Sequence, residues 1–129
     1  MELERFMVSH SQRKWDVGTV DCFLTLCDWV VFSGFPDMGA QYRGTYRDEA
    51  GYQKIFSRDG CYIDIIERGA KAIGLQHGVL SRGSIGVIGS ETNLNRQFGG
   101  IFDGNRWMVR LDEGFSPMIA KPLTVWGGF

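Results

Sequence analysis

The strongest constraint on this chain is an apolar segment that runs from Cys22 to Gly34 and directly follows Asp21. An Asp in front of an apolar run accepts hydrogen bonds from the free N–H groups of a first helical turn, and glycine suits the left-handed residue that closes many helices. We therefore predict a helix that begins at Cys22 and ends at Gly34, preceded by an irregular loop that carries Trp15. The rest of the chain is expected to pack around this helix.

The position of Cys22 is compatible with two roles. The positive end of a helix dipole favours thiolate over thiol, which makes Cys22 the best candidate for a catalytic nucleophile in this sequence. Free cysteine is also among the most frequently buried side chains, and a helix start supplies no base, so position alone favours a plain core residue. Cys27, in the middle of the same predicted helix, gains little from the dipole and serves as an internal comparison.

The length and composition indicate one domain over residues 1–129, long enough to bury a hydrophobic core. With 14 basic and 15 acidic residues the net charge is −1, which argues against nucleic acid or an anionic membrane as a partner. The 3 cysteines, at irregular spacing, do not form the pattern of a secreted disulfide framework and predict a reducing compartment. The N-terminus lacks the apolar region of a signal peptide, and no run approaches membrane-spanning length.

Helical patterns precede strand patterns along the chain. Besides the helix that begins at Cys22, helices are predicted at residues 3–12, 49–58 and 63–73. From Ser81 onward glycine becomes frequent, and short apolar runs predict strands at residues 85–88, 100–102, 107–111, 115–119 and 123–126. Asp103-Gly104-Asn105 is a strong hairpin signal, and the polar stretch 90–97 is expected to be a flexible loop. This order predicts an α+β domain in which N-terminal helices pack on a C-terminal curled antiparallel sheet.

The order of several motifs resembles a known family. A Trp-x-x-Gly loop at 15–18, Asp21-Cys22 opening an apolar helix, and a Gly-Ile-x-x-Gly hairpin at 100–104 resemble NlpC-type, papain-like cysteine peptidases, which cut peptide bonds in bacterial cell-wall stem peptides. The finer pattern resembles an uncharacterised family of small phage and prophage proteins related to that fold. The matching elements are Gly34-Phe35-Pro36-Asp37, Arg43-Gly44-Thr45-Tyr46, Glu49-Ala50-Gly51, Arg82-Gly83-Ser84 and Trp126. This likeness covers nearly the whole chain.

The resemblance implies a protein of the phage tail, at the tail tip or in tail assembly, made in the host cytoplasm and carried in the virion. Its implied partners are other phage tail proteins and, for an active enzyme, bacterial peptidoglycan. In active NlpC-like enzymes a histidine general base begins the strand that corresponds to residues 98–101, where this chain has Phe98. The strand that usually starts with Gly-Asp has Gly83-Ser84 instead. Only the nucleophile position, Cys22, matches the catalytic pattern.

The chain offers few other catalytic groups. His10 and His77 are its only imidazoles. Each is a weak candidate for the general base, and a helix-end or surface histidine is the better interpretation of both. Aromatic and arginine side chains near the predicted helix start are candidates for substrate binding, although core packing and local ion pairs explain such residues more often. These candidates are Trp15, Tyr42, Arg43 and Tyr46. No metal or cofactor is expected, since the cysteines and histidines show no ligand spacing.

Two functions are therefore in competition. The first is a degenerate NlpC-like domain that fills a mainly structural position in the tail. The alternative is an active, virion-associated cysteine endopeptidase or amidase that uses Cys22 on peptidoglycan stem peptides. Loss of a general base costs roughly 10² to 10⁴ in rate. The replacement at Phe98 therefore favours the structural interpretation.

Overall fold

A computed structural model describes residues 2–60, 62–93 and 96–129. Within these ranges the chain forms four helices followed by a six-stranded antiparallel sheet, which confirms the predicted α+β class. The helices are α1 (Glu2–Ser11), α2 (Cys22–Phe32), α3 (Glu49–Arg58) and α4 (Tyr62–Ile73). The strands are β1 (Gln76–His77), β2 (Ile85–Gly89), β3 (Gln97–Phe102), β4 (Trp107–Leu111), β5 (Gly114–Met118) and β6 (Thr124–Gly127).

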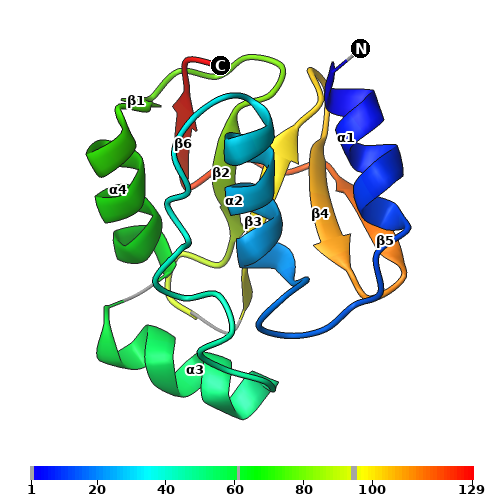
Figure 1. The fold of residues 1–129 in the computed structure, drawn as a ribbon. Coiled ribbons are helices and arrows are strands. Elements are labelled where there is room, and N and C mark those ends of the chain that lie inside the picture. The colour runs from blue at the N-terminus through cyan, green and yellow to red at the C-terminus, as the bar shows by residue number, and fades with distance from the viewer. Residues whose placement is uncertain (1, 61, 94–95) are drawn as a thin grey trace.

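The strands lie in the order β1-β6-β2-β3-β4-β5, and each neighbouring pair is antiparallel. Figure 1 shows α2 across the middle of one face of this sheet, with α1 beside β4 and β5 and α4 beside β1. Helix α2 contacts β3 and β4, while α1 contacts β5. The helix that the sequence places at the centre of the fold is thus the one that covers the central strands.

Helix α2 begins at Cys22 as predicted, and it ends at Phe32, two residues before the predicted end at Gly34. Asp21 caps it, its side chain accepting a hydrogen bond from the Leu24 N–H at 2.8 Å. Gly34 follows the last turn with a left-handed φ of 98°. The helix is apolar on almost all sides, which is typical of a helix enclosed by the core. Its buried residues are Phe23, Leu24, Thr25, Leu26, Cys27, Trp29 and Val30.

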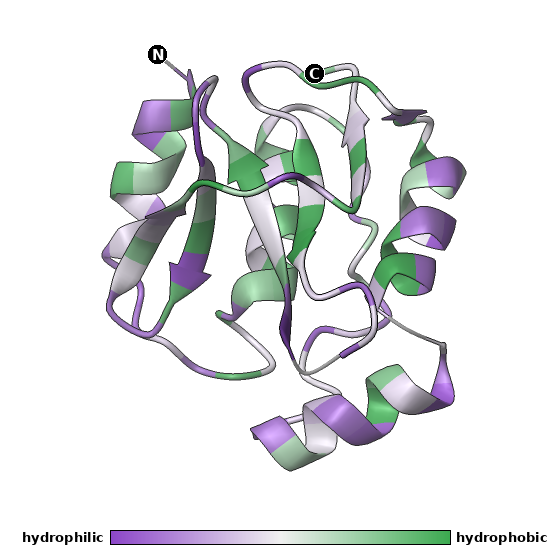
Figure 2. Cartoon of the chain, turned by 180° about the vertical axis from the view of Figure 1, so that it is seen from behind, coloured by the Kyte–Doolittle hydropathy of each residue, from purple (hydrophilic) through white to green (hydrophobic). Residues whose placement is uncertain are grey.

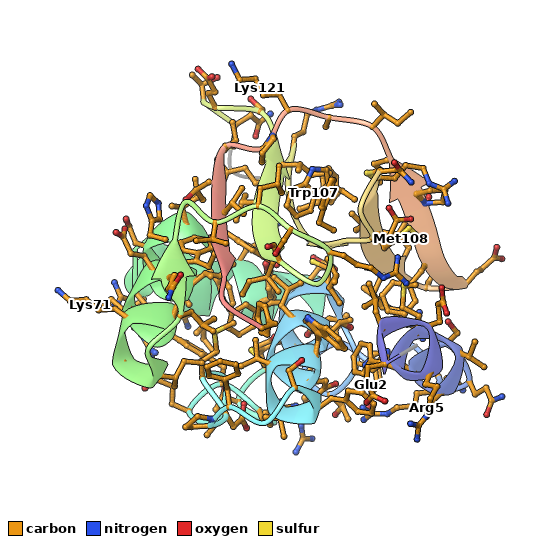
Figure 3. The ribbon with its side chains drawn as sticks, turned by 90° about the horizontal axis from the view of Figure 1, so that it is seen from above. Glu2, Arg5, Lys71, Trp107, Met108 and Lys121 are labelled. Carbon is orange, nitrogen blue, oxygen red and sulfur yellow. The ribbon has the colours of Figure 1, made fainter. Side chains whose placement is uncertain are left out.

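Hydrophobic side chains fill both faces of the sheet. The larger cluster lies between the sheet and the helices, and a smaller cluster of Ile88, Trp107, Val109 and Val125 forms a separate group. Figure 3 shows Trp107 on the side of the sheet away from α2, beneath the segment that carries Lys121. Figure 2 shows hydrophobic residues concentrated on α2 and the central strands, with hydrophilic residues on the outer sides of α3 and α4. Within the described residues no helix is long and apolar enough to cross a membrane.

Two strand predictions need correction. β3 begins at Gln97 rather than at residue 100, so the predicted loop at 90–97 ends one residue earlier. β1 was not predicted at all, because it consists of two exposed polar residues that pair only with β6. Such a short strand forms because β6 pairs with it, and two residues are too few to show a periodic pattern in the sequence. The other helices and strands agree with their predicted ranges to within one residue at most ends.

Candidate active site

A cavity of about 180 Å³ lies at the first turn of α2. Its walls come from the loop before α2, the start of α3, the start of β3 and the end of β4. They include Trp15, Asp21, Cys22, Glu49, Tyr52, Gln97, Phe98 and Leu111. Two of the residues singled out by sequence, Cys22 and Trp15, are therefore brought together.

The cavity opens where two strands of the sheet diverge. β3 and β4 pair only through Ile101 with Met108 and through Phe102 with Trp107, at one end of each strand. Figure 1 shows the first turn of α2 opposite the ends of these strands that are not paired. The Gly99 N–H, which has no partner on β4, lies near enough to the Cys22 sulfur to lower the pKa of the thiol. The thiol thus lies beside the part of β3 that does not pair with β4.

Burial keeps the Cys22 thiol protonated at neutral pH. Loss of solvation raises its pKa to about 11, and the carboxylates of Asp21 and Glu49 add to that rise. The Tyr62 hydroxyl, 3.7 Å from the sulfur, and the Gly99 N–H lower the pKa by less. The expectation that a helix start favours thiolate is therefore wrong here. Desolvation of a charged sulfur outweighs the field of one helix end.

Asp21 has a structural role. Its Oδ1 accepts from the Leu24 N–H, while its Oδ2 accepts from the Gly18 N–H at 3.0 Å and from the Tyr46 hydroxyl at 2.7 Å. A side chain at position 18 would meet the Tyr46 carbonyl oxygen at 1.9 Å, and Gly18 has a left-handed φ of 96°. These contacts hold the loop, the helix start and the Tyr46 segment together. The buried carboxylate remains close enough to act on the thiol.

The alternation of β3 decides which side chain faces α2. A Cβ at Gly99 would lie 2.4 Å from the Tyr62 hydroxyl and 2.6 Å from the Leu26 Cδ1, so this position faces the helices. Gln97, two residues earlier, shares that face because side chains alternate along a strand. Phe98 pairs with Ile88 and packs against the second cluster on the opposite face. Phe98, the residue at the position expected to hold the general base, therefore belongs to the other face of β3, and its neighbour Gln97 belongs to the α2 face. Both residues line the cavity.

Neither histidine lines the cavity. His10 is buried against the rings of Phe6 and Phe115, and its Nε2 lies 2.9 Å from the Asp28 Oδ2. Asp28 stands six positions after Cys22 on α2, so His10 meets the helix well beyond the thiol. His77 is exposed on β1, with its Nε2 3.0 Å from the Thr124 hydroxyl. The predicted base candidates are therefore both occupied elsewhere.

A family model described as a domain of unknown function (DUF6950) matches residues 1–126. The chain belongs to the DUF6950 family. No curated protein and no solved structure matches it.

In this DUF6950 chain the tyrosines proposed for substrate binding belong to the core. Tyr42 is buried edge-on against Phe23, and its hydroxyl donates to Asp59 at 3.0 Å. Tyr46 is buried and donates to Asp21. Aromatic rings beside glycine-rich turns pack inward here because both hydroxyls find carboxylate partners.

Arg43, the fourth substrate-binding candidate, is held by acidic residues of the same protein. Its Nε lies 2.8 Å from the Asp37 Oδ2, and its second terminal nitrogen lies 2.8 Å from the Asp28 Oδ1. The two carboxylates raise the pKa of the Arg43 guanidinium above its ordinary value. This guanidinium is committed to internal ion pairs and does not line the cavity.

Several cavity residues of the DUF6950 chain had no signal in the sequence. Glu49 and Tyr52 were expected only as part of a helix, and Gln97 as the end of a loop. Their meeting at the cavity depends on how α3 and β3 pack around α2. Within the described residues no group of histidine, cysteine or acidic side chains is suited to hold a metal ion. Cys61, the third cysteine, lies outside the described residues.

Proposed function

We propose that this DUF6950 chain is a structural component of a phage tail, at the tail tip or in tail assembly, built on an NlpC-like cysteine-peptidase fold whose catalytic chemistry has been lost. The motif order of the sequence supports the placement in a tail. The α+β order of elements, with a cysteine at the first turn of a central helix packed on an antiparallel sheet, is consistent with the NlpC-like kinship.

One observation supports the loss of catalysis: none of the described residues that line the cavity around Cys22 is a histidine. A cysteine peptidase needs a thiolate, a proton carrier for the leaving amine and an oxyanion site. Burial holds the thiol protonated, with a pKa of about 11. Gln97, the residue of β3 on the α2 face, is an amide and carries no proton that titrates near neutral pH. The nucleophile position is present, and the groups that would activate it are not among the residues that line the cavity.

A cell-wall assay tests this loss. Purified protein is incubated with isolated peptidoglycan sacculi, and newly released amino groups are measured. We expect no release above that of the Cys22→Ser variant. Release that disappears in Cys22→Ser would overturn the proposal and support the alternative, an active virion-associated endopeptidase or amidase that uses Cys22.

A particle assay tests the placement in a tail. Phage particles are purified from a host that encodes the chain, and their proteins are identified by mass spectrometry. We expect the chain in the tail fraction or in tail intermediates, and we expect its deletion to block tail assembly. Particles carrying Cys22→Ser should assemble normally, because a structural role does not use the thiol as a nucleophile. Absence from particles and intermediates, with normal tails after deletion, would overturn the placement.

A further inference from the structure

A groove lined by aromatic rings lies at the end of α2 opposite the Cys22 cavity. It has a volume of about 410 Å³, and its lining residues include Leu3, Trp29, Phe32, Gly83 and Phe129. Phe32 at the end of α2 is 42% exposed, and Phe129 after β6 is 38% exposed. Two phenylalanine rings therefore lie open to solvent at this groove, which we call the Phe32 groove.

The rings of the Phe32 groove hold one another in place. Phe32 stacks on Trp29 with 5.8 Å between the ring centres, and Phe129 lies 6.0 Å from Trp29. The Trp29 indole N–H donates to the Gly83 carbonyl oxygen at 2.7 Å. A Cβ at Gly83 would lie only 3.2 Å from the indole ring, so the loop before β2 packs closely on it. Little side-chain freedom is lost when a fixed aromatic surface of this kind is covered, which favours association.

The grouping of these rings distinguishes them from other exposed apolar side chains. Ile119 is 89% exposed but does not line the Phe32 groove. Single exposed apolar residues are common on protein surfaces and need no partner. Exposed rings that gather at a groove with a polar rim mark an interaction site. The groove is therefore the strongest candidate for a protein contact in the described part of the chain.

The charged residues of the groove match those of an identical groove. Glu2 of α1 and Arg82 of the loop before β2 line its wall, and Figure 3 shows Glu2 between α1 and α2. The Glu2 side chain is 70% exposed, and Arg82, which pairs with Glu4 at 3.0 Å, keeps 34% of its side chain exposed. A wall with one charge of each sign favours a partner that carries both signs. Two-fold symmetry presents the same surface on both copies, so each carboxylate is offered the guanidinium of the other copy.

We propose that the Phe32 groove is the contact surface of a homodimer with two-fold symmetry. The Phe32 and Phe129 rings of each copy pack against those of the other, and Glu2 of one copy faces Arg82 of the other. The Cys22 cavity, at the opposite end of α2, stays open in this dimer. This inference goes beyond the proposed function, and it depends neither on the placement in a tail nor on the loss of catalysis.

Sedimentation velocity of the purified chain over a range of concentrations tests the dimer. We expect a reversible monomer–dimer equilibrium with a dissociation constant below about 100 μM. In NMR spectra of the same dilution series, the signals of Phe32, Phe129 and the Trp29 indole should shift, while those of the Cys22 cavity should not. A monomer at every concentration up to about 1 mM would overturn the proposal and leave the groove to a different partner. Shifts confined to another surface would also overturn it.

A matched pair of variants tests the aromatic contact. Phe32→Glu places a charge in the groove and should weaken the dimer at least about hundredfold. Ile119→Glu makes an equivalent change outside the groove and should leave the dissociation constant unchanged. Near-UV circular dichroism establishes that each variant is folded. An unchanged dimer in folded Phe32→Glu would overturn the proposal, as would equal weakening in both variants.

Reversal of single charges tests the two-fold arrangement without altering the rings. A dimer of Glu2→Arg would place arginines opposite each other, and a dimer of Arg82→Glu would do the same with carboxylates. Each variant alone should therefore dimerise at least about threefold more weakly. A one-to-one mixture restores both ion pairs, so a fluorescent label on one variant should reveal a heterodimer in preference to either homodimer. Absence of this preference in folded variants would overturn the proposed arrangement.

Discussion

Helix α2 carries partly buried polar groups at two places, and the surroundings of the two groups are opposite in charge. In its middle, the Asp28 carboxylate contacts three nitrogen groups: the His10 Nε2 lies 2.9 Å away, and Arg13 and Arg43 form ion pairs with it at 3.2 and 2.8 Å. At its first turn, the Cys22 thiol lies beside the carboxylates of Asp21 and Glu49 with no basic residue on the described cavity wall.

The difference separates a carboxylate that is paired with basic side chains from a thiol that has carboxylates, and no basic residue, beside it on the described cavity wall. The Asp28 carboxylate has its partners within the chain, so its interactions are used to fasten α1 and the segment of Arg43 to α2. Near the first turn the Gln97 Oε1 is buried without a hydrogen-bond partner, and in the Asp28 group the His10 Nδ1 is buried without one as well. The predictions below test whether this contrast is real.

The largest expected effect concerns the pH dependence of Cys22 alkylation. The raised pKa of about 11 means that the unreactive thiol predominates at every lower pH and that the thiolate grows as pH rises. From pH 7 to pH 10 the rate of reaction with iodoacetamide should therefore rise roughly a thousandfold, about tenfold per unit. Site-resolved mass spectrometry of the native protein measures this rate. A plateau near neutral pH would reveal a stabilised thiolate and contradict the contrast.

Removal of the Asp28 carboxylate should cost the most stability. Asp28→Ala leaves His10 and two arginines without their shared partner, and we expect a loss of about 3 kcal/mol in the free energy of unfolding. Urea denaturation measures it. The control is Arg5→Ala, whose pair with Glu2 is exposed, with 72% and 70% of the side chains accessible. That variant should lose at most about 0.5 kcal/mol, and equal losses would show that the Asp28 cluster has no special role.

A smaller loss in the free energy of unfolding is expected for a substitution in β3, where the sheet approaches the helices. Gly99→Ala places a methyl group against the Tyr62 hydroxyl and Leu26, at contacts of 2.4 and 2.6 Å. Such overpacking should lower the free energy of unfolding by about 2 kcal/mol. The neighbour Gly100→Ala meets Trp107 at a milder 3.3 Å and should cost less. Urea denaturation of both compares them, and a larger loss at position 100 would contradict the assignment of strand faces.

The smallest expected effect is the partial restoration of an activated thiol. Gln97→His places an imidazole on the face of β3 toward α2, and near neutral pH alkylation of Cys22 should become about tenfold faster. Phe98→His is the matched control, because its side chain belongs to the other face and should raise the rate less. Iodoacetamide labelling of each folded variant provides the comparison. Faster labelling in Phe98→His would show that the resemblance, and not the strand alternation, identifies the residue facing the thiol.

Local features of the chain were predictable because their causes are local. The Asp21 cap, the left-handed Gly34 and the start of α3 at Glu49 each depend on a few consecutive residues. The hairpin turn at Asp103 is of the same kind, with its side chain accepting from the Asn105 and Arg106 N–H groups. Such features are satisfied within one turn of chain, so the pattern that encodes them stays visible in the sequence.

The site was only partly predictable. Cys22 and Trp15 were singled out and do line the cavity, while Gln97 was assigned to a loop and Glu49 to the start of a helix. Tyr42, Tyr46 and Arg43 were chosen because their hydroxyl and guanidinium groups suit substrate binding. In the fold these groups bind carboxylates of the same chain. Their partners, such as Asp59 for Tyr42, lie well away along the chain, and no spacing rule connects them.

The sequence by itself determined that a thiol begins the central helix and that helices come before an antiparallel sheet, because capping and periodicity act over neighbouring residues. Only the tertiary structure decided that this thiol stays protonated, that β3 presents an amide to it, and that both imidazoles are used elsewhere. The physical reason is that desolvation and hydrogen bonding depend on which segments meet in space. At Cys22 these are β3, α3 and α4, all distant along the chain.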